Sequence, residues 1–137
     1  MVVIAAVSDG EPDEQIVQEA AALAAAFEDE LHVIHVQTYE ALTDEGQKQT
    51  DESIKQQTAA VAADTAAGSD VPVVPVGRIG KPAPEVLEYA STVDTRYIVI
   101  GGQKRSPVGK ALFGSTTQQI LLSAELPVLT VMAQQTK

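Results

Sequence analysis

The regular alternation of β-branched apolar runs with longer helical segments constrains this chain most. The connections between successive runs are all longer than a dozen residues and each contains a helical pattern. Hairpins need only a few connecting residues, whereas parallel neighbours need a crossover, so these connections predict parallel pairing. The runs predict five strands, at residues 2–7, 31–36, 71–76, 97–100 and 128–132.

The helical segments complete the prediction of the fold. In the first segment an apolar stripe begins after Pro12-Asp13-Glu14 and ends at Phe27, and we expect this stripe to lie on the sheet. The other predicted helices span about 47–67, 84–90 and 115–124. Together the elements predict an α/β fold, with an open parallel five-stranded sheet and helices on both faces. Because the chain has 137 residues and 45% apolar content, we expect one domain over residues 1–137.

Charge narrows the classes of partner. The chain has 19 acidic and nine basic residues, a formal charge of −10, which argues against binding to nucleic acid or to anionic membranes. Six of the nine bases but only three acids lie between Arg78 and Lys110. An acidic composition with few lysines is typical of proteins from a high-salt cytoplasm, so we hypothesise a halophilic source. No membrane-length apolar run and no secretory signal are visible, so we expect a cytoplasmic protein.

Cysteine and histidine usage restricts metal and redox chemistry. The chain has no cysteine, which excludes disulfides and thiolate sites. His32 and His35 are the only imidazoles, and they are three positions apart in a predicted strand. This spacing directs them to opposite faces of the sheet, so they cannot share a metal ion. We expect one of them to be exposed and the other to pack or to cap.

The segment from Gly101 to Ser115 is the best candidate for a functional site. It follows the fourth predicted strand, and ligands of open parallel sheets collect at the carboxyl ends of strands. Its glycines would let backbone N–H groups approach a ligand, and the helix that begins near Ser115 would add unpaired donors. Lys104, Arg105 and Lys110 add positive charge. The segment therefore predicts a phosphate-binding loop, although it matches neither a Walker loop nor a dinucleotide fingerprint.

Purely structural roles compete for the same residues. Ser115 and Gln118 have the spacing of a capping box, so capping alone is an equal alternative for Ser115. The other structural alternatives are a plain strand exit for Gly101-Gly102, solvated loop charges for Lys104 and Arg105, and a first-turn helix acid for Asp9.

With these features the chain resembles the universal stress protein family over essentially its whole length. The resemblance rests on Ser8-Asp9-Gly10-Glu11-Pro12, on the second strand Leu31-His32-Val33-Ile34-His35-Val36, on Gly80, and on Gly114-Ser115 before Pro127-Val128-Leu129-Thr130-Val131. In nucleotide-binding members the signature is Gly, two residues, Gly, nine residues, then Gly and Ser or Thr. Gly101 and Gly114-Ser115 fit it, but Lys104 occupies the second glycine position. Ser8 stands where the family usually has Asp.

The resemblance implies a strand order of 3-2-1-4-5, homodimers that often involve the last strand, and an adenine nucleotide such as ATP between the ends of strands one and four. It implies that Ala6, Val7 and Ser8 line the adenosine, that Val36 contacts the base, and that Gly101, Gly114, Ser115 and Thr116 hold the phosphates. To these the residues themselves add Gly102, Lys104 and Arg105 on the phosphate side and Asp9 near the adenosine. A serine at position 8 lacks the charge-assisted hydrogen bond of an aspartate, worth about 1.5–3 kcal/mol. The Lys104 side chain both obstructs a close backbone approach and offers a compensating ammonium.

The expected function is noncatalytic. No general base is predicted beside the glycine-rich segment, so we do not expect efficient hydrolysis. We expect a cytoplasmic, homodimeric sensor or regulator that binds ATP or another adenine nucleotide. Mg²⁺ is an optional ligand of the phosphates. Two alternatives stay open. One is a slow Mg²⁺-dependent ATPase, and the other is a nucleotide-free dimeric stress or interaction module, which the residues Ser8 and Lys104 favour.

Overall fold

The computed structural model describes residues 1–7, 13–39, 50–102 and 114–132. Its elements, in chain order, are β1 (Val2–Val7), α1 (Asp13–Phe27), β2 (Glu30–Gln37), α3 (Asp51–Thr65), β3 (Val73–Ile79), α4 (Pro82–Thr92), β4 (Thr95–Gly102), α5 (Ser115–Ser123) and β5 (Val128–Met132). All strand pairs are parallel, and the order across the sheet is β3-β2-β1-β4-β5. The predicted fold class and strand order are therefore confirmed. Among these residues, no helix has the length and apolar character needed to cross a membrane.

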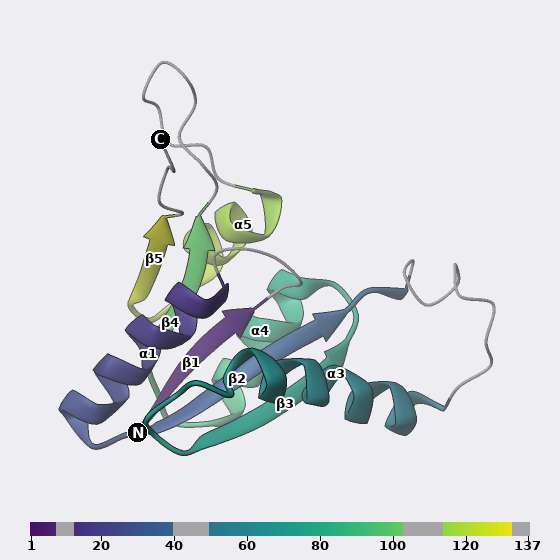
Figure 1. The fold of residues 1–137 in the computed structure, drawn as a ribbon. Coiled ribbons are helices and arrows are strands. Elements are labelled where there is room, and N and C mark those ends of the chain that lie inside the picture. The colour runs from purple at the N-terminus through teal and green to yellow at the C-terminus, as the bar shows by residue number, and fades with distance from the viewer. Residues whose placement is uncertain (8–12, 40–49, 103–113, 133–137) are drawn as a thin grey trace, which may run out of the picture.

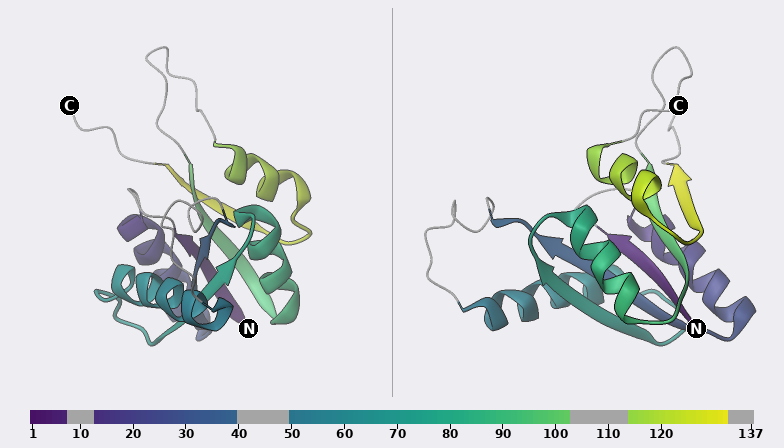
Figure 2. Two further views of the ribbon diagram at one scale, coloured as in Figure 1. Left: turned by 90° about the vertical axis from the view of Figure 1, so that its right-hand side faces the viewer. Right: turned by 180° about the vertical axis from the view of Figure 1, so that it is seen from behind.

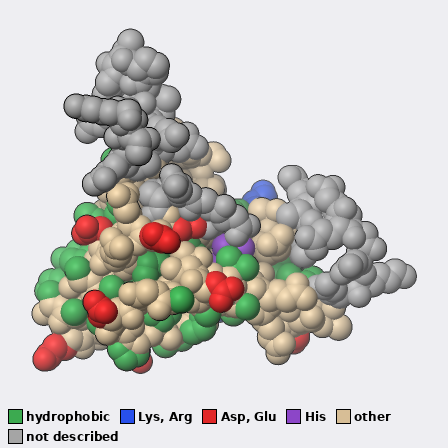
Figure 3. Space-filling view, in the orientation of Figure 1, with side chains coloured by type: hydrophobic (Ala, Val, Ile, Leu, Met, Phe, Trp, Pro, Cys, Tyr) green, Lys and Arg blue, Asp and Glu red, His purple; other side chains and the backbone are tan. Residues whose placement is uncertain are grey.

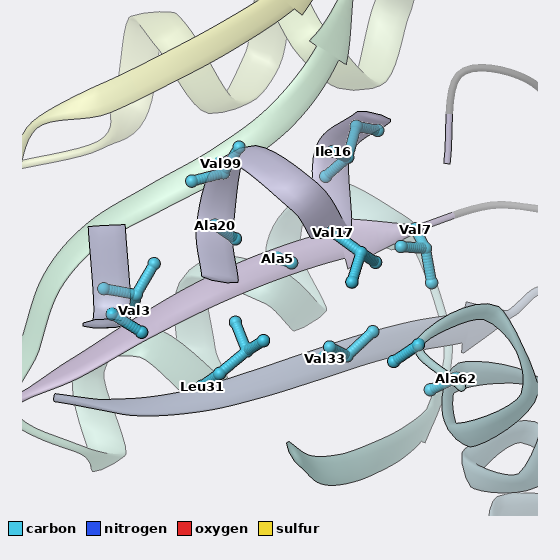
Figure 4. Packing of buried hydrophobic residues seen from close by; sticks show 12 residues of the cluster. Val3, Ala5, Val7, Ile16, Val17, Ala20, Leu31, Val33, Ala62 and Val99 are labelled. Atoms are coloured by element: carbon cyan, nitrogen blue, oxygen red, sulfur yellow. The ribbon is translucent and has the colours of Figure 1, made fainter. Parts of the chain in front are cut away.

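Helices cover both faces of the twisted sheet (Figures 1 and 2). Helices α1 and α3 lie on one face, and α4 and α5 lie on the other. Successive side chains of β1 point to opposite faces of the sheet and so contribute to both layers of the core. Val3, Ala5 and Val7 point to the α1 side, and Val2 and Ile4 point to the α4 side. Figure 4 shows the first layer, in which side chains of β1, β2 and β4 meet those of α1 and α3. A strand that is buried on both faces needs apolar side chains on both, which explains why such strands appear in the sequence as unbroken apolar runs.

Strands β3 and β4 differ from their predicted ranges at both ends. Strand β3 begins two residues later than predicted and continues to Ile79, because its pairing with β2 runs as far as Gln37. Strand β4 covers 95–102 instead of 97–100, because Gly101 and Gly102 pair with Val131 and Met132 of β5. These two glycines end a strand, so the prediction that a loop begins at Gly101 is wrong.

The helix boundaries differ in a similar way. Helix α3 begins at Asp51 rather than at 47, because Thr50 is extended and its Oγ1 accepts a hydrogen bond from the Ser53 N–H at 3.1 Å. Helix α4 is longer than predicted, with Pro82 in its first turn.

Phe27 departs from the prediction for α1. It is 42% exposed instead of lying on the sheet, and its ring packs against the Arg96 guanidinium, 4.2 Å from the ring centroid, and against Tyr97. The last turn of α1 therefore contacts the start of β4 rather than the centre of the sheet.

Both histidines are buried, so the prediction that one is exposed is wrong. His32 is 7% and His35 is 4% exposed, because β2 is an interior strand with helices over both faces. His32 Nδ1 lies 2.6 Å from the hydroxyl of Tyr89 in α4. Burial raises the pKa of Tyr89, an effect that nearby Arg78 opposes, so at neutral pH its hydroxyl keeps its proton.

Candidate functional site

A cavity of about 530 Å³ lies at the carboxyl edge of the sheet. Its walls come from the ends of β1, β2 and β4 and from the first residues of three helices, Asp13 of α1, Pro82 of α4 and Ser115 of α5. The volume is in the range of small-molecule sites, which are about 300–1,000 Å³. Each helix N-terminus carries a partial positive charge, so three of them around one cavity favour an anionic ligand.

The first turn of α5 supplies the clearest donors. Gly114 is extended (φ −68°, ψ 165°) and occupies the cap position, and the Gln118 N–H makes the first intrahelical hydrogen bond, to the Gly114 carbonyl at 3.0 Å. The three preceding N–H groups of the helix have no partner in its ladder, and α5 has no acid in its first turn. Ser115 is the first helical residue and Gly114 holds the N-cap position that a capping box requires of the serine, so the capping-box alternative is wrong.

Thr117 connects this helix to the strand beside it. The side chain is 7% exposed, and its Oγ1 donates a hydrogen bond to the Gly101 carbonyl at 2.6 Å. The bond satisfies a carbonyl at the end of β4 and fixes the first turn of α5 against the strand. Sequence reasoning missed Thr117, although its position three residues before buried Ile120 places both on the inner face of α5.

The cavity has an apolar and a polar part. Aliphatic side chains of β1, β2, β4 and the two helices behind them form the apolar part: Ala6, Ile34, Val36, Val86, Ile100 and Ile120. Asp13, His35, Gln37 and Thr38 form the polar part, together with the α5 turn. A flat apolar group can pack on the first surface while polar groups of the same ligand reach the second.

Eight of the predicted site residues lie on the wall of this one cavity: Ala6, Val7, Val36, Gly101, Gly102, Gly114, Ser115 and Thr116. The other four, Ser8, Asp9, Lys104 and Arg105, lie outside the described residues. Sequence reasoning missed Asp13 and His35 as wall residues. In the sequence, Asp13 indicated only the start of a helix. The direction of the His35 side chain depends on which face of β2 packs against α1, and the sequence alone does not show that.

Charge and metal-binding groups are distributed unevenly. Figure 3 shows acidic side chains scattered over the face of the molecule that α1 and α3 cover, where basic side chains hardly appear. In the part of the chain that the structure describes, no group of three or more His, Asp or Glu side chains is placed to hold a metal ion.

Comparison with known proteins gives a consistent result. The model of the universal stress protein family matches residues 1–132. A universal stress protein of Mycolicibacterium smegmatis is 45% identical over 47 residues, which is 34% of this chain and 36% of that protein. The match to this curated relative thus spans only about a third of its length.

Solved structures match over nearly the whole chain. The universal stress protein of Archaeoglobus fulgidus in complex with dAMP has a TM-score of 0.63 and 20% identity, with 94% of both chains covered. A universal stress protein in complex with cAMP has a TM-score of 0.70 and 18% identity, with 98% of both chains covered. At these identities the two structures show the shared fold.

Proposed function

The chain belongs to the universal stress protein family, and from this premise we propose that it binds an adenine nucleotide, ATP first, as a noncatalytic sensor or regulator. One observation carries the proposal: an apolar surface and the open amides of α5 line the same cavity. The complexes of two similar structures with dAMP and with cAMP support it, because both ligands contain adenine, a sugar and a phosphate.

In this proposal each part of the ligand has a matching surface. The adenine packs on the apolar part, near Val36 and Ala6, and the phosphates accept hydrogen bonds from the N–H groups of Ser115 and Thr116. Lys104 and Arg105 are proposed to add positive charge to the phosphate side. The protein would thereby recognise the nucleotide without breaking a bond.

Titration calorimetry with ATP, ADP and AMP tests this function. We expect saturable binding by the native chain and a loss of about a hundredfold or more in Gly114→Val, because a branched side chain at the helix cap crowds the phosphate side. Gly68→Val is the matched control, since a Cβ at Gly68 meets nothing within 4 Å. Silence of the native chain at millimolar ligand would instead support the nucleotide-free module that Ser8 and Lys104 favour.

Two further measurements address the rest of the proposal. We propose a homodimer, and sedimentation equilibrium with and without ATP measures it; the partly exposed Leu129 on edge strand β5 is compatible with such pairing. Phosphate release measured with and without Mg²⁺ separates binding from slow hydrolysis. Release that depends on Mg²⁺ and disappears in Gly114→Val would favour the ATPase.

A further inference from the structure

Met132, at the end of β5, covers one side of Gly102. The two residues are paired in the sheet, and a Cβ at Gly102 would collide with the Met132 sulfur and lie 3.3 Å from its Cε. The thioether therefore rests on the Gly102 backbone, in the space that a side chain at that position would fill. Met132 is partly exposed, and β5 is an edge strand of the sheet, so small molecules in solution can reach this side chain.

Gly102 connects this contact to the candidate site. It lies on the wall of the cavity of about 530 Å³. The carbonyl of the preceding residue, Gly101, accepts the Thr117 hydrogen bond that holds the first turn of α5. The N–H groups proposed to bind phosphates belong to that turn. A change in the packing of Met132 therefore acts on the cavity wall and on the backbone next to the anchor of α5.

A thioether in this position can be oxidised without help from another group of the protein. Hydrogen peroxide transfers one oxygen atom to the sulfur: an S–O bond forms, the O–O bond breaks, the sulfur loses two electrons, and the peroxide is reduced to water. The product, methionine sulfoxide, is larger and polar. If the sulfoxide stays in place, its oxygen crowds Gly102, and if it turns toward solvent, Gly102 loses its apolar cover. Both arrangements change the wall of the cavity.

We infer that Met132 is an oxidation site: conversion to the sulfoxide by a peroxide lowers nucleotide affinity, and reduction of the sulfoxide restores it. The inference rests on the proposed function and adds a regulation of that same site. The chain has no cysteine and two methionines, so the other thioether is that of Met1. Met1 is 49% exposed and precedes β1, at the opposite edge of the sheet from the cavity, so its oxidation should not affect binding.

Peroxide treatment, followed by peptide mass mapping and titration with ATP, tests the inference. We expect one added oxygen atom on Met132 and a fall in ATP affinity of about tenfold, because an extra polar atom is forced against a packed position. The two methionine sulfoxide reductases, one for each epimer, should restore both the mass and the affinity. The circular dichroism spectrum should stay native throughout.

Met132→Leu provides the matched control. Leucine conserves the volume and the apolar character but has no sulfur, so peroxide then oxidises Met1 alone and should not change the ATP affinity of this variant. Met132→Gln places a polar group at the same position and should lower the affinity without peroxide. Each treated sample is compared with the same variant before treatment.

Other results would contradict the inference. Oxidation of Met1 but not of Met132, or an oxidised Met132 with unchanged ATP affinity, would overturn it and leave the proposed function intact. An equal loss of affinity in treated Met132→Leu, or unfolding of the treated native chain, would also overturn it, because damage elsewhere would then account for the loss. Absence of ATP binding by the untreated chain would overturn the proposed function and this inference together.

Discussion

Two glycines on opposite sides of the sheet permit close approaches, but the atoms that approach them differ in kind. At Gly77 of β3, a Cβ would collide with the Lys55 carbonyl oxygen and lie 2.6 Å from the Ala59 nitrogen, both of the α3 backbone. At Gly102 of β4, a Cβ would meet the Met132 sulfur and the Thr130 Cγ2, the ends of side chains of β5. Backbone atoms of a helix can give way only if the helix itself moves, whereas a methionine side chain can adopt another rotamer. We therefore expect a side chain at Gly77 to cost more stability than one at Gly102, and a change at Gly102, which lines the cavity, to affect the site as well.

Gly77→Ala should have the largest effect. The helix must move away from the strand, so we expect the free energy of unfolding to fall by about 3 kcal/mol or more. Urea unfolding followed by circular dichroism measures the loss. Gly68→Ala is the control and should change stability by less than about 0.5 kcal/mol, because nothing lies near its Cβ. A mild effect of Gly77→Ala would remove the contrast between the two glycines.

Gly102→Ala should cost less, about 1–2 kcal/mol, because the Met132 side chain can adopt another rotamer. The same change should weaken nucleotide binding, since Gly102 is on the cavity wall. Combining it with Met132→Ala sharpens the comparison. A double-mutant cycle in urea should show a coupling of about 0.5 kcal/mol or more, and strict additivity would mean that the two residues do not meet as described.

Tyr89→Phe tests whether the stability of the β3 side of the sheet depends on another contact besides the close approach at Gly77. The change leaves buried His32 Nδ1 without its hydroxyl partner, and we expect a loss of about 1–2 kcal/mol in urea unfolding. The double variant His32→Leu with Tyr89→Phe should recover part of this loss, because both polar partners are then replaced. A double variant as unstable as the sum of its single changes would argue against the pairing.

The smallest effect concerns acid pH on the β4 side. Arg96 at the start of β4 donates a hydrogen bond to the buried Asp29 carboxylate and lowers the pKa of Asp29 below its usual value near 4. The stabilisation is complete above that usual value and is lost as the pH falls through the lower value of the folded state. Urea unfolding of the native chain and of Asp29→Asn should therefore differ most near pH 6 and converge toward pH 2. A difference independent of pH would show that the carboxylate charge contributes nothing.

The positions of the strands could be predicted because each buried parallel strand is an apolar run of its own sequence. Their ends could not, since Ile79 continues β3 only through its pairing with Gln37, and Gly102 continues β4 through Met132. The strand order was inferred from the family resemblance, because alternation along the chain leaves the order of strands in the sheet open.

The candidate site shows the same division between local and distant information. Gly114 and Ser115 could be predicted from a glycine before a helix, which is a local pattern. Asp13 and Thr117 reach the cavity through contacts with segments far away in sequence, such as the Gly101 carbonyl for Thr117. Burial of His35 likewise required knowing that β2 lies inside the sheet.

The hydrogen bond from Thr117 to Gly101 has a consequence for recognition. Because the hydroxyl holds the start of α5 against β4 at 2.6 Å, the donor groups of that turn are arranged before a ligand arrives. Binding of a ligand then requires little further ordering of the protein, so less of the favourable interaction free energy is lost and the affinity is higher.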